Sequence, residues 1–351
     1  MLRASIIKNL KYLFVLCFVP LFARADIGIA VAPQKFDLVI FPGETFEGEI
    51  RIKNQSKIAL PISVKALPFG AQEGTGEMEF QKPEKSSPVF WFKFKKSEMI
   101  LEPEEKKIIK FEIKVPPETE PGGYYVFVYF EPRFPSQYFE GSGPKTIPVV
   151  GIPFLISTSE LLLEPQKGNE FEVMEFSIPE KERVRLLENL FGQISKSLKF
   201  VGLARAAQNS EILFTKKSPS YLLVKVKNND IYHLKPFGTI SFYNFFGKKI
   251  GELKLKGETI LPGKSREFKV NLSDNLHLGI LGKFKAELDL KAQSPVRGEI
   301  NLVGKRPSLS FFPLSNFYFL IFTIIILTIG YLGRRRIKLA LKVLIWKKTK
   351  K

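Results

Sequence analysis

The sequence predicts a mainly β protein: two immunoglobulin-like β-sandwiches with a helical insertion, followed by one C-terminal transmembrane helix. Three observations predict it. Short runs of alternating apolar and polar residues, separated by turn signals, extend from about residue 27 to residue 160. The same layout returns from about 220 to 303, and an uncharged apolar stretch then precedes a basic C-terminus.

Residues 1–25 have the features of a secretory signal peptide. A basic start precedes an apolar run at 12–22, which is too short to span a bilayer as a helix. Ala23 and Ala25 follow as the two small side chains that a signal peptidase needs. We therefore predict cleavage before Asp26, the alternative being an uncleaved anchor.

The distribution of charge argues against a nucleic-acid partner. The formal net charge is +19, but four Lys or Arg lie in residues 1–25 and nine in residues 334–351, with no acidic residue in either segment. The remainder of the chain is only mildly basic. The one cysteine, Cys17, lies in the predicted signal, so disulfides and Cys-ligated metals are not expected in the mature chain.

The first sandwich is expected over residues 26–163. The runs 46–53 and 107–115 alternate strictly, and 124–130 is apolar on both faces, as in a central strand. In the run 89–95, alternation places three phenylalanines on one face and Trp91, with two lysines, on the other.

An internal repeat defines the second sandwich, expected over residues 164–305. The strand and asparagine at 50–54 match those at 224–228. From Pro103 onward the match to Pro262 and beyond continues without gaps at an offset of 159. Each copy therefore has a proline-led turn, a strand with one apolar face, and then a central strand that starts near a glycine.

A helical segment is expected at about 180–208, between the repeated parts. Ser177 and Glu180 have the spacing of a capping box, and apolar residues from Val184 to Val201 recur on one helical stripe. This stripe is expected to pack on a sandwich face, and the alternative is a helix that binds a partner.

The C-terminus predicts a single membrane crossing at 313–333. Basic residues follow it at once, and by the positive-inside rule Arg334, Arg335, Arg336 and Lys338 hold the tail, 334–351, in the cytoplasm. The chain is therefore expected in the cell membrane with its N-terminal part extracellular or periplasmic. The transmembrane helix and the basic tail are expected to contact lipid, the alternative for the tail being a short disordered basic segment. A fragment that lacks 311–351 is expected to remain folded.

Enzymatic activity is not expected. His233 and His277 are the only histidines, and each stands alone in a turn-like context. None of the common nucleophile, zinc, phosphate-loop or dinucleotide motifs is present. No catalytic residue, metal site or cofactor is therefore predicted.

One loop is a candidate ligand-binding site. Residues 129–144 leave a predicted strand and carry Arg133, Phe134, Tyr138 and Phe139 among prolines. Exposed aromatic rings on a stiff loop can bind carbohydrate or protein at a small entropic cost. Alternatively, the rings fold back onto the sandwich. Trp91 is a weaker candidate for the same role.

The chain resembles the WxL-interacting proteins of bacterial cell surfaces. The resemblance is carried by residues 29–68, with the turn at Pro42-Gly43, by 101–125, with Pro121-Gly122-Gly123, and by 224–290. It implies a first domain that binds peptidoglycan, a second that binds protein partners, and a C-terminal membrane anchor.

We therefore expect a membrane-anchored bacterial cell-surface protein whose two Ig-like domains bind a cell-envelope component. That component is a cell-wall polymer such as peptidoglycan, or another surface protein. The alternative is a membrane-tethered scaffold or chaperone-like assembly factor, which donates sheet edges to secreted surface proteins.

Overall fold

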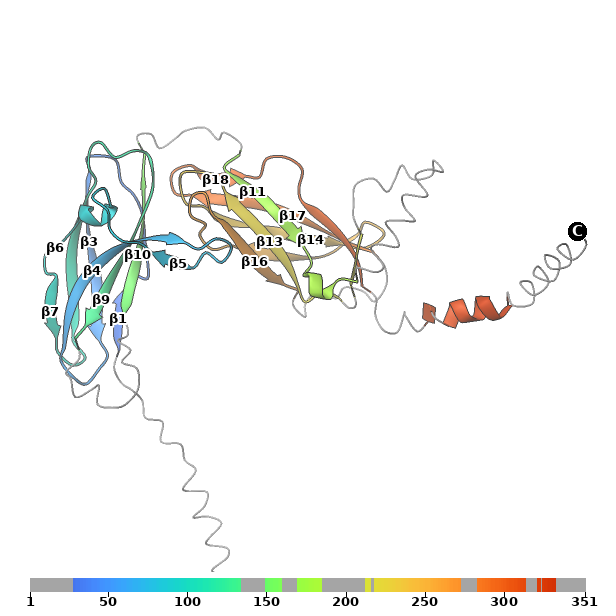
Figure 1. Ribbon diagram of the computed structural model, residues 1–351, viewed down its shortest axis with the longest axis horizontal. Helices are drawn as coiled ribbons and strands as arrows, with labels where there is room; N and C mark the ends of the chain where they lie inside the picture. Colours follow the sequence, from blue (N-terminus) through green and yellow to red (C-terminus); the bar gives the residue numbers. More distant parts are fainter. Residues whose placement is uncertain are drawn as a thin grey trace, which may run out of the picture.

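Two β-sandwich domains make up the fold, which is described here by a computed structural model. Residues 28–133, 149–159, 169–184, 212–215, 218–272, 283–313, 321–322 and 324–332 are described (Figure 1). The predicted cleavage residues Ala23 and Ala25 lie outside the described residues, as do Arg334, Arg335, Arg336 and Lys338.

The first domain packs two sheets face to face. One sheet has the strand order β1 (Ile29–Ala32), β3 (Thr45–Asn54), β8 (Lys106–Lys114) and β6 (Phe92–Phe94). The other has the order β2 (Phe36–Val39), β10 (Val150–Thr158), β9 (Gly122–Pro132), β4 (Leu60–Ala71) and β5 (Met78–Phe80). A further strand, β7 (Glu98–Leu101), also pairs with β4.

Alternation along the strands builds the core of this domain. Ile109, Phe111 and Ile113 of β8 are buried, while the residues between them are more exposed. The ring of Phe154 stacks on Phe36 at 4.5 Å and meets Phe111 edge-on at 5.3 Å, so both sheets contribute rings to one cluster. The predicted alternating strands at 46–53 and 107–115 are thereby confirmed.

The second domain repeats this plan with fewer strands. One sheet has the order β11 (Phe171–Ser177), β13 (Tyr221–Asn228) and β16 (Ser265–Asn271). The other has the order β12 (Ile212–Thr215), β19 (Ser308–Pro313), β17 (Phe284–Ser294), β14 (Lys235–Tyr243) and β15 (Lys249–Lys256). A short strand, β18 (Gly298–Asn301), pairs with β17.

Two buried asparagines confirm the internal repeat at the level of hydrogen bonds. Asn54, at the end of β3, donates from Nδ2 to the carbonyl oxygen of Leu101 at 3.1 Å. Asn228, at the end of β13, donates in the same way to Ile260 at 3.0 Å. Leu101 and Ile260 are related by the sequence offset of 159, and both asparagines are fully buried. The two copies therefore match in their hydrogen bonds as well as in their sequence.

The predicted start of the helical insertion is wrong. Ser177 ends β11, and its hydroxyl bonds the Glu175 carboxylate, so it caps no helix. A single 3₁₀ turn, Glu180–Glu182, follows and has no side-chain cap. The rest of the predicted segment, 185–208, lies outside the described residues.

The second sandwich extends beyond its predicted end at residue 305. Strand β19 pairs in parallel with β12 and antiparallel with β17, and its Phe311 is fully buried. Residues 308–313 therefore belong to the core of the second domain, although their uncharged sequence resembles the start of a membrane helix. A fragment that lacks 311–351 would lose part of this strand, so the expectation that it remains folded no longer holds for the second domain. Residues 321–322 and 324–332 are helical, but no described helix meets the length and hydropathy that a membrane crossing requires.

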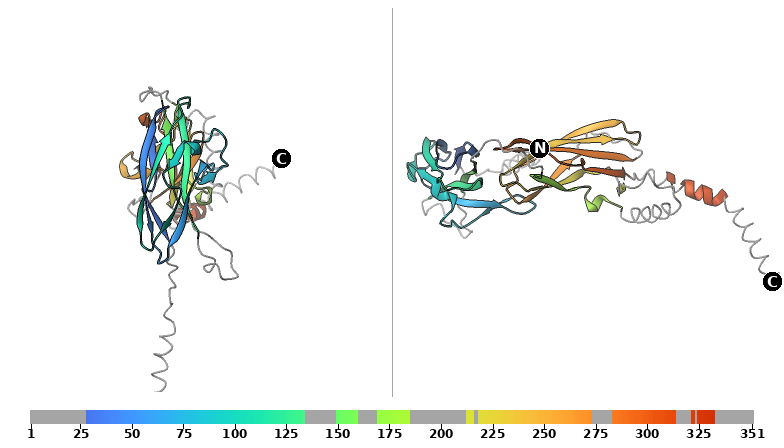
Figure 2. Two further views of the ribbon diagram at one scale, coloured as in Figure 1. Left: turned by 90° about the vertical axis from the view of Figure 1, so that its left-hand side faces the viewer. Right: turned by 90° about the horizontal axis from the view of Figure 1, so that it is seen from above.

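The two domains meet at a steep angle, which is visible from two directions (Figures 1 and 2). The hairpin formed by β4 and β5 leaves the first domain and reaches the second. Phe69 and Ala71 of β4 pack there with Leu261, beside Tyr125 and Phe127, in a small apolar cluster of its own. Chain segments far apart in sequence thus form one junction.

Candidate functional site

The predicted binding loop is described only at its first residues. Arg133 directly follows β9 and forms an exposed ion pair with Glu98, with 3.3 Å between Nη2 and Oε1. It borders a shallow pocket of about 270 Å³ on β4 and β7. Phe134, Tyr138 and Phe139 lie outside the described residues, so their role as a ligand-binding group stays a prediction.

The placement of Trp91 on the outer face is wrong. A 3₁₀ turn, η1 (Pro88–Trp91), precedes β6 and breaks the alternation that would have turned Trp91 outward. The Trp91 side chain is 8% exposed and packs against Tyr124, with 4.8 Å between ring centroids. Phe90 points to solvent instead, at 66% exposure. Trp91 therefore fills the core of the first domain.

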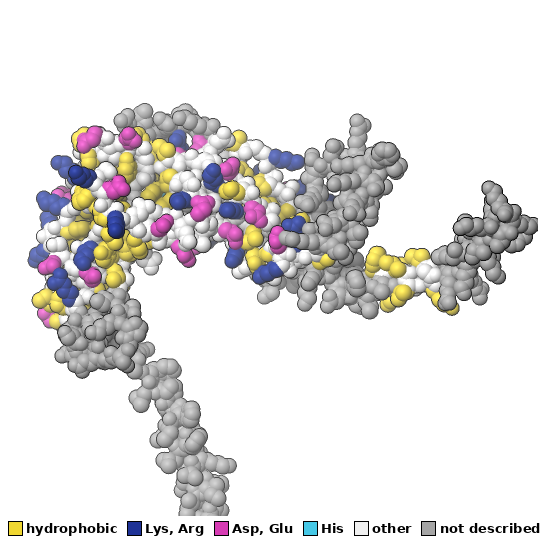
Figure 3. Space-filling model, in the orientation of Figure 1, with side chains coloured by type: hydrophobic (Ala, Val, Ile, Leu, Met, Phe, Trp, Pro, Cys, Tyr) yellow, Lys and Arg dark blue, Asp and Glu magenta, His cyan; other side chains and the backbone are white. Residues whose placement is uncertain are grey.

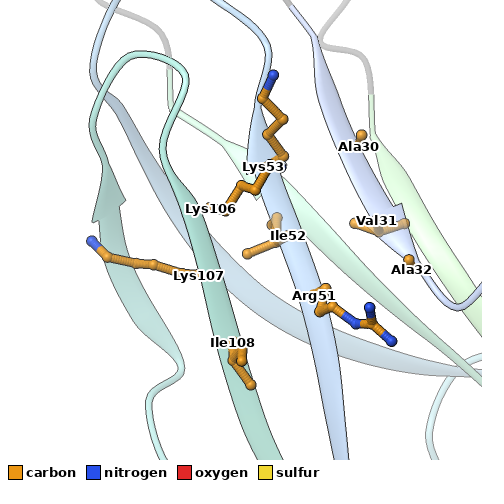
Figure 4. A pocket seen from close by; sticks show the side chains of 9 residues that line it. All are labelled: Ala30, Val31, Ala32, Arg51, Ile52, Lys53, Lys106, Lys107 and Ile108. Carbon is orange, nitrogen blue, oxygen red and sulfur yellow. The ribbon is translucent and has the colours of Figure 1, made fainter.

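A second pocket lies on the outer face of the first sheet and is rich in basic residues (Figure 4). It has a volume of about 440 Å³ on β1, β3 and β8. Lys53 pairs with Glu104 at 2.6 Å and Lys107 pairs with Glu105 at 3.0 Å. The side chains of Arg51, Lys53 and Lys107 point in different directions. They do not converge on one ligand position.

The largest of these pockets is a groove in the second domain, between the edge strands of its two sheets. It has a volume of about 580 Å³ and lies between β15 and β16. Partly buried apolar side chains of both strands line it and pack against the core: Leu253, Phe268 and Val270. The groove is therefore an opening into the edge of the sandwich, lined by residues that a closed sandwich would cover.

Strand β16 offers free backbone groups to this groove. Gly74, on the β4–β5 hairpin, donates its N–H to the Ser265 oxygen at 3.0 Å and accepts from the Glu267 N–H at 2.9 Å. These two residues of β16 therefore direct their polar backbone groups away from β13. Because strand backbones alternate, Lys269 and Asn271 direct theirs the same way. No described residue pairs with these two.

The first domain shows what fills the equivalent position. There β6 pairs with β8 through Phe92, Lys93 and Phe94. Phe92 meets Phe154 edge-on at 5.0 Å, so β6 closes the sandwich with rings. The carbonyl oxygen of Lys110 on β8 accepts the Lys95 N–H at 3.2 Å.

The offset of 159 relates that Lys110 to Lys269 of β16. Among the described residues, the second domain has no counterpart of β6. The groove is thus the place of a strand that the first copy supplies from its own chain.

Basic side chains border the groove. Lys254, Lys256 and Lys269 are exposed and form no ion pair with any described residue. Arg266 is neutralised by Glu258. The resulting positive rim favours a ligand with acidic groups on its outer side.

Polar contacts at the domain junction join the first domain to the second at one end of the groove. The Ser265 hydroxyl donates to the Glu73 carboxylate, and the Ser265 N–H donates to the same oxygen at 3.2 Å. The hydroxyl bond, more than any other cause, lowers the pKa of Glu73. Tyr232 of the second domain also donates its hydroxyl to the Thr158 oxygen at 3.1 Å. The first domain therefore keeps a fixed place beside β16.

A buried histidine crosses the same junction. His233, 4% exposed, contacts Asp37 of the first domain, with 3.0 Å between Nε2 and Oδ1. Burial alone would raise the pKa of Asp37. The hydrogen bond and charge of His233, helped by Lys35, outweigh burial and lower that pKa to about 2.

Replacing Asp37 with asparagine should flatten the acid branch of the stability curve. The pKa of Asp37 is lower in the folded protein than in the unfolded chain. Its contribution is therefore complete above pH 4 and is lost as the pH falls to 2. Because the carboxylate is 37% exposed, solvent screening reduces that contribution to about 1 kcal/mol. Denaturant unfolding of the wild-type chain and Asp37→Asn at pH 7, 4 and 2 measures it. A constant difference between the two proteins across this range would contradict the assignment.

The groove was not predicted from the sequence. The apolar residues of β15 and β16 alternate as in any half-buried strand, so they give no sign that their cover is incomplete. One signal was available in principle. The repeat matches β8 to β16, yet the segment that forms β6 in the first copy has no match in the second.

Comparisons with known proteins find similarity in structure only. No protein-family model matches the chain, and neither does any curated protein sequence. Among solved structures, the class 5 fimbriae chaperone CfaA is 12% identical with a TM-score of 0.37, covering 82% of this chain and 99% of that one. The E. coli chaperone DraB is 10% identical with a TM-score of 0.34, covering 81% and 98%. The Pseudomonas aeruginosa CupB2 chaperone is 11% identical with a TM-score of 0.33, covering 80% and 98%. Similarity at this level carries no argument about function.

Proposed function

We propose that this chain is a membrane-anchored assembly protein of the bacterial cell surface. It binds an extended segment of a secreted surface protein in the groove between β15 and β16. This is strand addition, in which main-chain hydrogen bonds give affinity and alternate side chains give specificity. The observation that supports it most is the edge of β16 beyond Glu267, which no described residue pairs with, beside a groove lined by core residues.

The shape of the groove favours an extended segment with alternating side chains. Lys269 and Asn271 offer backbone groups on the open edge, and Phe268 and Val270 line the apolar floor. A segment that pairs there would direct every second side chain onto this floor, as Phe92 and Phe94 do in the first domain. Its other side chains would face the lysine rim, where acidic residues fit best.

The membrane anchor is part of the same proposal. The described helical residues from 324 to 332 are apolar apart from one threonine and one glycine, and they are largely exposed (Figure 3). Aromatic residues precede this stretch and arginines follow it. We therefore retain one crossing within 313–333, which begins after β19. Binding of peptidoglycan by the first domain stays a prediction from the family resemblance.

Substitution of Lys269 by proline should weaken strand addition without unfolding the domain. Proline removes the outward N–H and places a ring on the open edge, and edge strands tolerate it. A suitable probe is a labelled peptide with the sequence of residues 90–96 in which glutamate replaces each lysine. Binding to the full-length protein in detergent is measured by fluorescence anisotropy. The loss of one hydrogen bond, about 1.4 kcal/mol, predicts affinity about tenfold lower for Lys269→Pro.

The matched control is Lys269→Ala, which keeps the backbone N–H and should bind the probe nearly as well as the wild-type protein. Thermal unfolding shows whether the proline variant retains its second domain. Equal affinity of a folded Lys269→Pro protein and the wild-type protein would exclude strand addition at β16.

A further inference from the structure

The turn between β14 and β15 presents two phenylalanines to solvent. Phe245 is 69% exposed and Phe246 is 89% exposed, with 5.6 Å between their ring centroids. The turn is well built: the Asn244 side-chain oxygen accepts the N–H groups of Phe246 and Lys248, each at 3.0 Å. Exposed aromatic rings on a fixed turn are solvated unfavourably by water and contribute nothing to the core, which indicates that they bind a ligand.

This turn lies at the end of the second domain from which the chain continues toward the predicted anchor. Tyr243 of β14 faces Lys285 of β17, and the adjacent Phe284 faces Phe311 of β19. The turn and the end of β19 are thus two strands apart, about 10 Å at the usual strand spacing. The second view in Figure 2 shows the helix leaving from this end of the domain.

The chain between the domain and the anchor is short. Four residue steps lead from Pro313, the last residue of β19, to Phe317, where the uncharged apolar run begins. A fully extended chain spans about 3.5 Å per residue, so this tether reaches at most about 14 Å. If the run enters the bilayer at Phe317, the end of the second domain lies close to the membrane surface.

We propose that the Phe245-Phe246 turn inserts into the surface of the lipid bilayer beside the anchor. This inference rests on the anchor of the proposed function. The rings enter the interface between headgroups and acyl chains, where apolar side chains gain from leaving water. Lys248 forms no ion pair with a described residue and is free to meet anionic headgroups. The turn and the anchor together fix the second domain against the membrane at two points.

Fluorescence quenching by labelled lipid tests the contact in the full-length chain. Cys17 is the only native cysteine and is replaced by serine. An environment-sensitive dye is attached at Lys248→Cys, and in a second protein at Lys57→Cys, an exposed site on the first domain. Both are reconstituted in phosphatidylcholine–phosphatidylglycerol vesicles that contain nitroxide lipid. We expect strong quenching at 248 and none at 57. Phe245→Ser with Phe246→Ser should remove the quenching at 248 while the protein still floats with the vesicles.

Three outcomes would overturn the proposal, and they differ from one another. If the protein floats with vesicles but neither 248 nor 57 is quenched, the chain is anchored and its turn does not touch lipid. A dye at 248 that is shielded from aqueous iodide but not quenched by lipid shows that protein covers the turn. A chain that does not float with vesicles refutes the anchor, and with it this inference.

Discussion

A chain that ends at Ser310 is expected to lose its second domain, whereas a chain that ends at Pro313 is expected to keep it. The shorter chain lacks Phe311, which is fully buried and contacts Phe284 at 5.7 Å. It also loses three of the four residue pairs that hold β12 to β19. Removal of one large buried aromatic side chain costs about 3–5 kcal/mol. Calorimetry of 26–310 and 26–313 should therefore show one thermal transition and two transitions, respectively.

Point variants of the full-length chain distinguish the contribution of the Phe311 side chain from that of the strand pairing of β19. Phe311→Ala should destabilise the second domain by several kcal/mol. Phe312→Ala, at a partly exposed position beside it, should cost far less. If 26–310 unfolds in two transitions like 26–313, then β19 contributes little to the core and the described boundary is wrong.

Asn54→Ala should be one of the most damaging single substitutions in the first domain. The two hydrogens of the Asn54 Nδ2 group are shared among the oxygens of Ile58, Leu101 and Glu102, at 2.7, 3.1 and 3.0 Å. Its own oxygen accepts the Ser56 N–H at 2.9 Å. Alanine would leave several of these groups unpaired in a buried place, at a cost of about 3 kcal/mol. For a domain of this size that corresponds to a Tm lower by about 10 °C.

The neighbouring Gln55 is exposed, and Gln55→Ala provides the matched control with little expected change. The repeat supplies a second test, because Asn228→Ala should lower the melting temperature of the other domain. A small effect of Asn54→Ala, similar to that of Gln55→Ala, would show that water replaces these hydrogen bonds and that they do not stabilise the domain.

The general fold was predictable because alternation and repeat act locally in the sequence. Runs such as 46–53 and 107–115 form strands as expected, and the two-copy pattern extends to the buried asparagines. The structure adds the hydroxyl-to-backbone bond of a tyrosine corner, which Tyr124 donates to the carbonyl oxygen of Glu120 at 2.9 Å.

The errors arose where local patterns are ambiguous. A proline-led 3₁₀ turn before β6 interrupts the alternation of inward and outward side chains, and Trp91 turns inward as a result. The apolar residues of β19 have the composition of a membrane helix, so only their pairing with β12 and β17 reveals a strand. The groove arises because no described strand pairs with the outer edge of β16 beyond Glu267, and a local pattern cannot reveal such a missing neighbour. His233 and Asp37 are far apart in sequence and come into contact only in the folded chain.

The contact of Gly74 with β16 has a consequence for any segment that enters the groove. Gly74 occupies the outward backbone groups of Ser265 and Glu267, so an incoming strand can slide along β16 only until it meets this hairpin. A slip by one residue would turn its apolar side chains away from the floor. The hairpin therefore limits how far an incoming strand can extend along β16 and so fixes the register in which it pairs. A change in the hairpin would then alter which residues of a partner face inward, while the groove itself stayed intact.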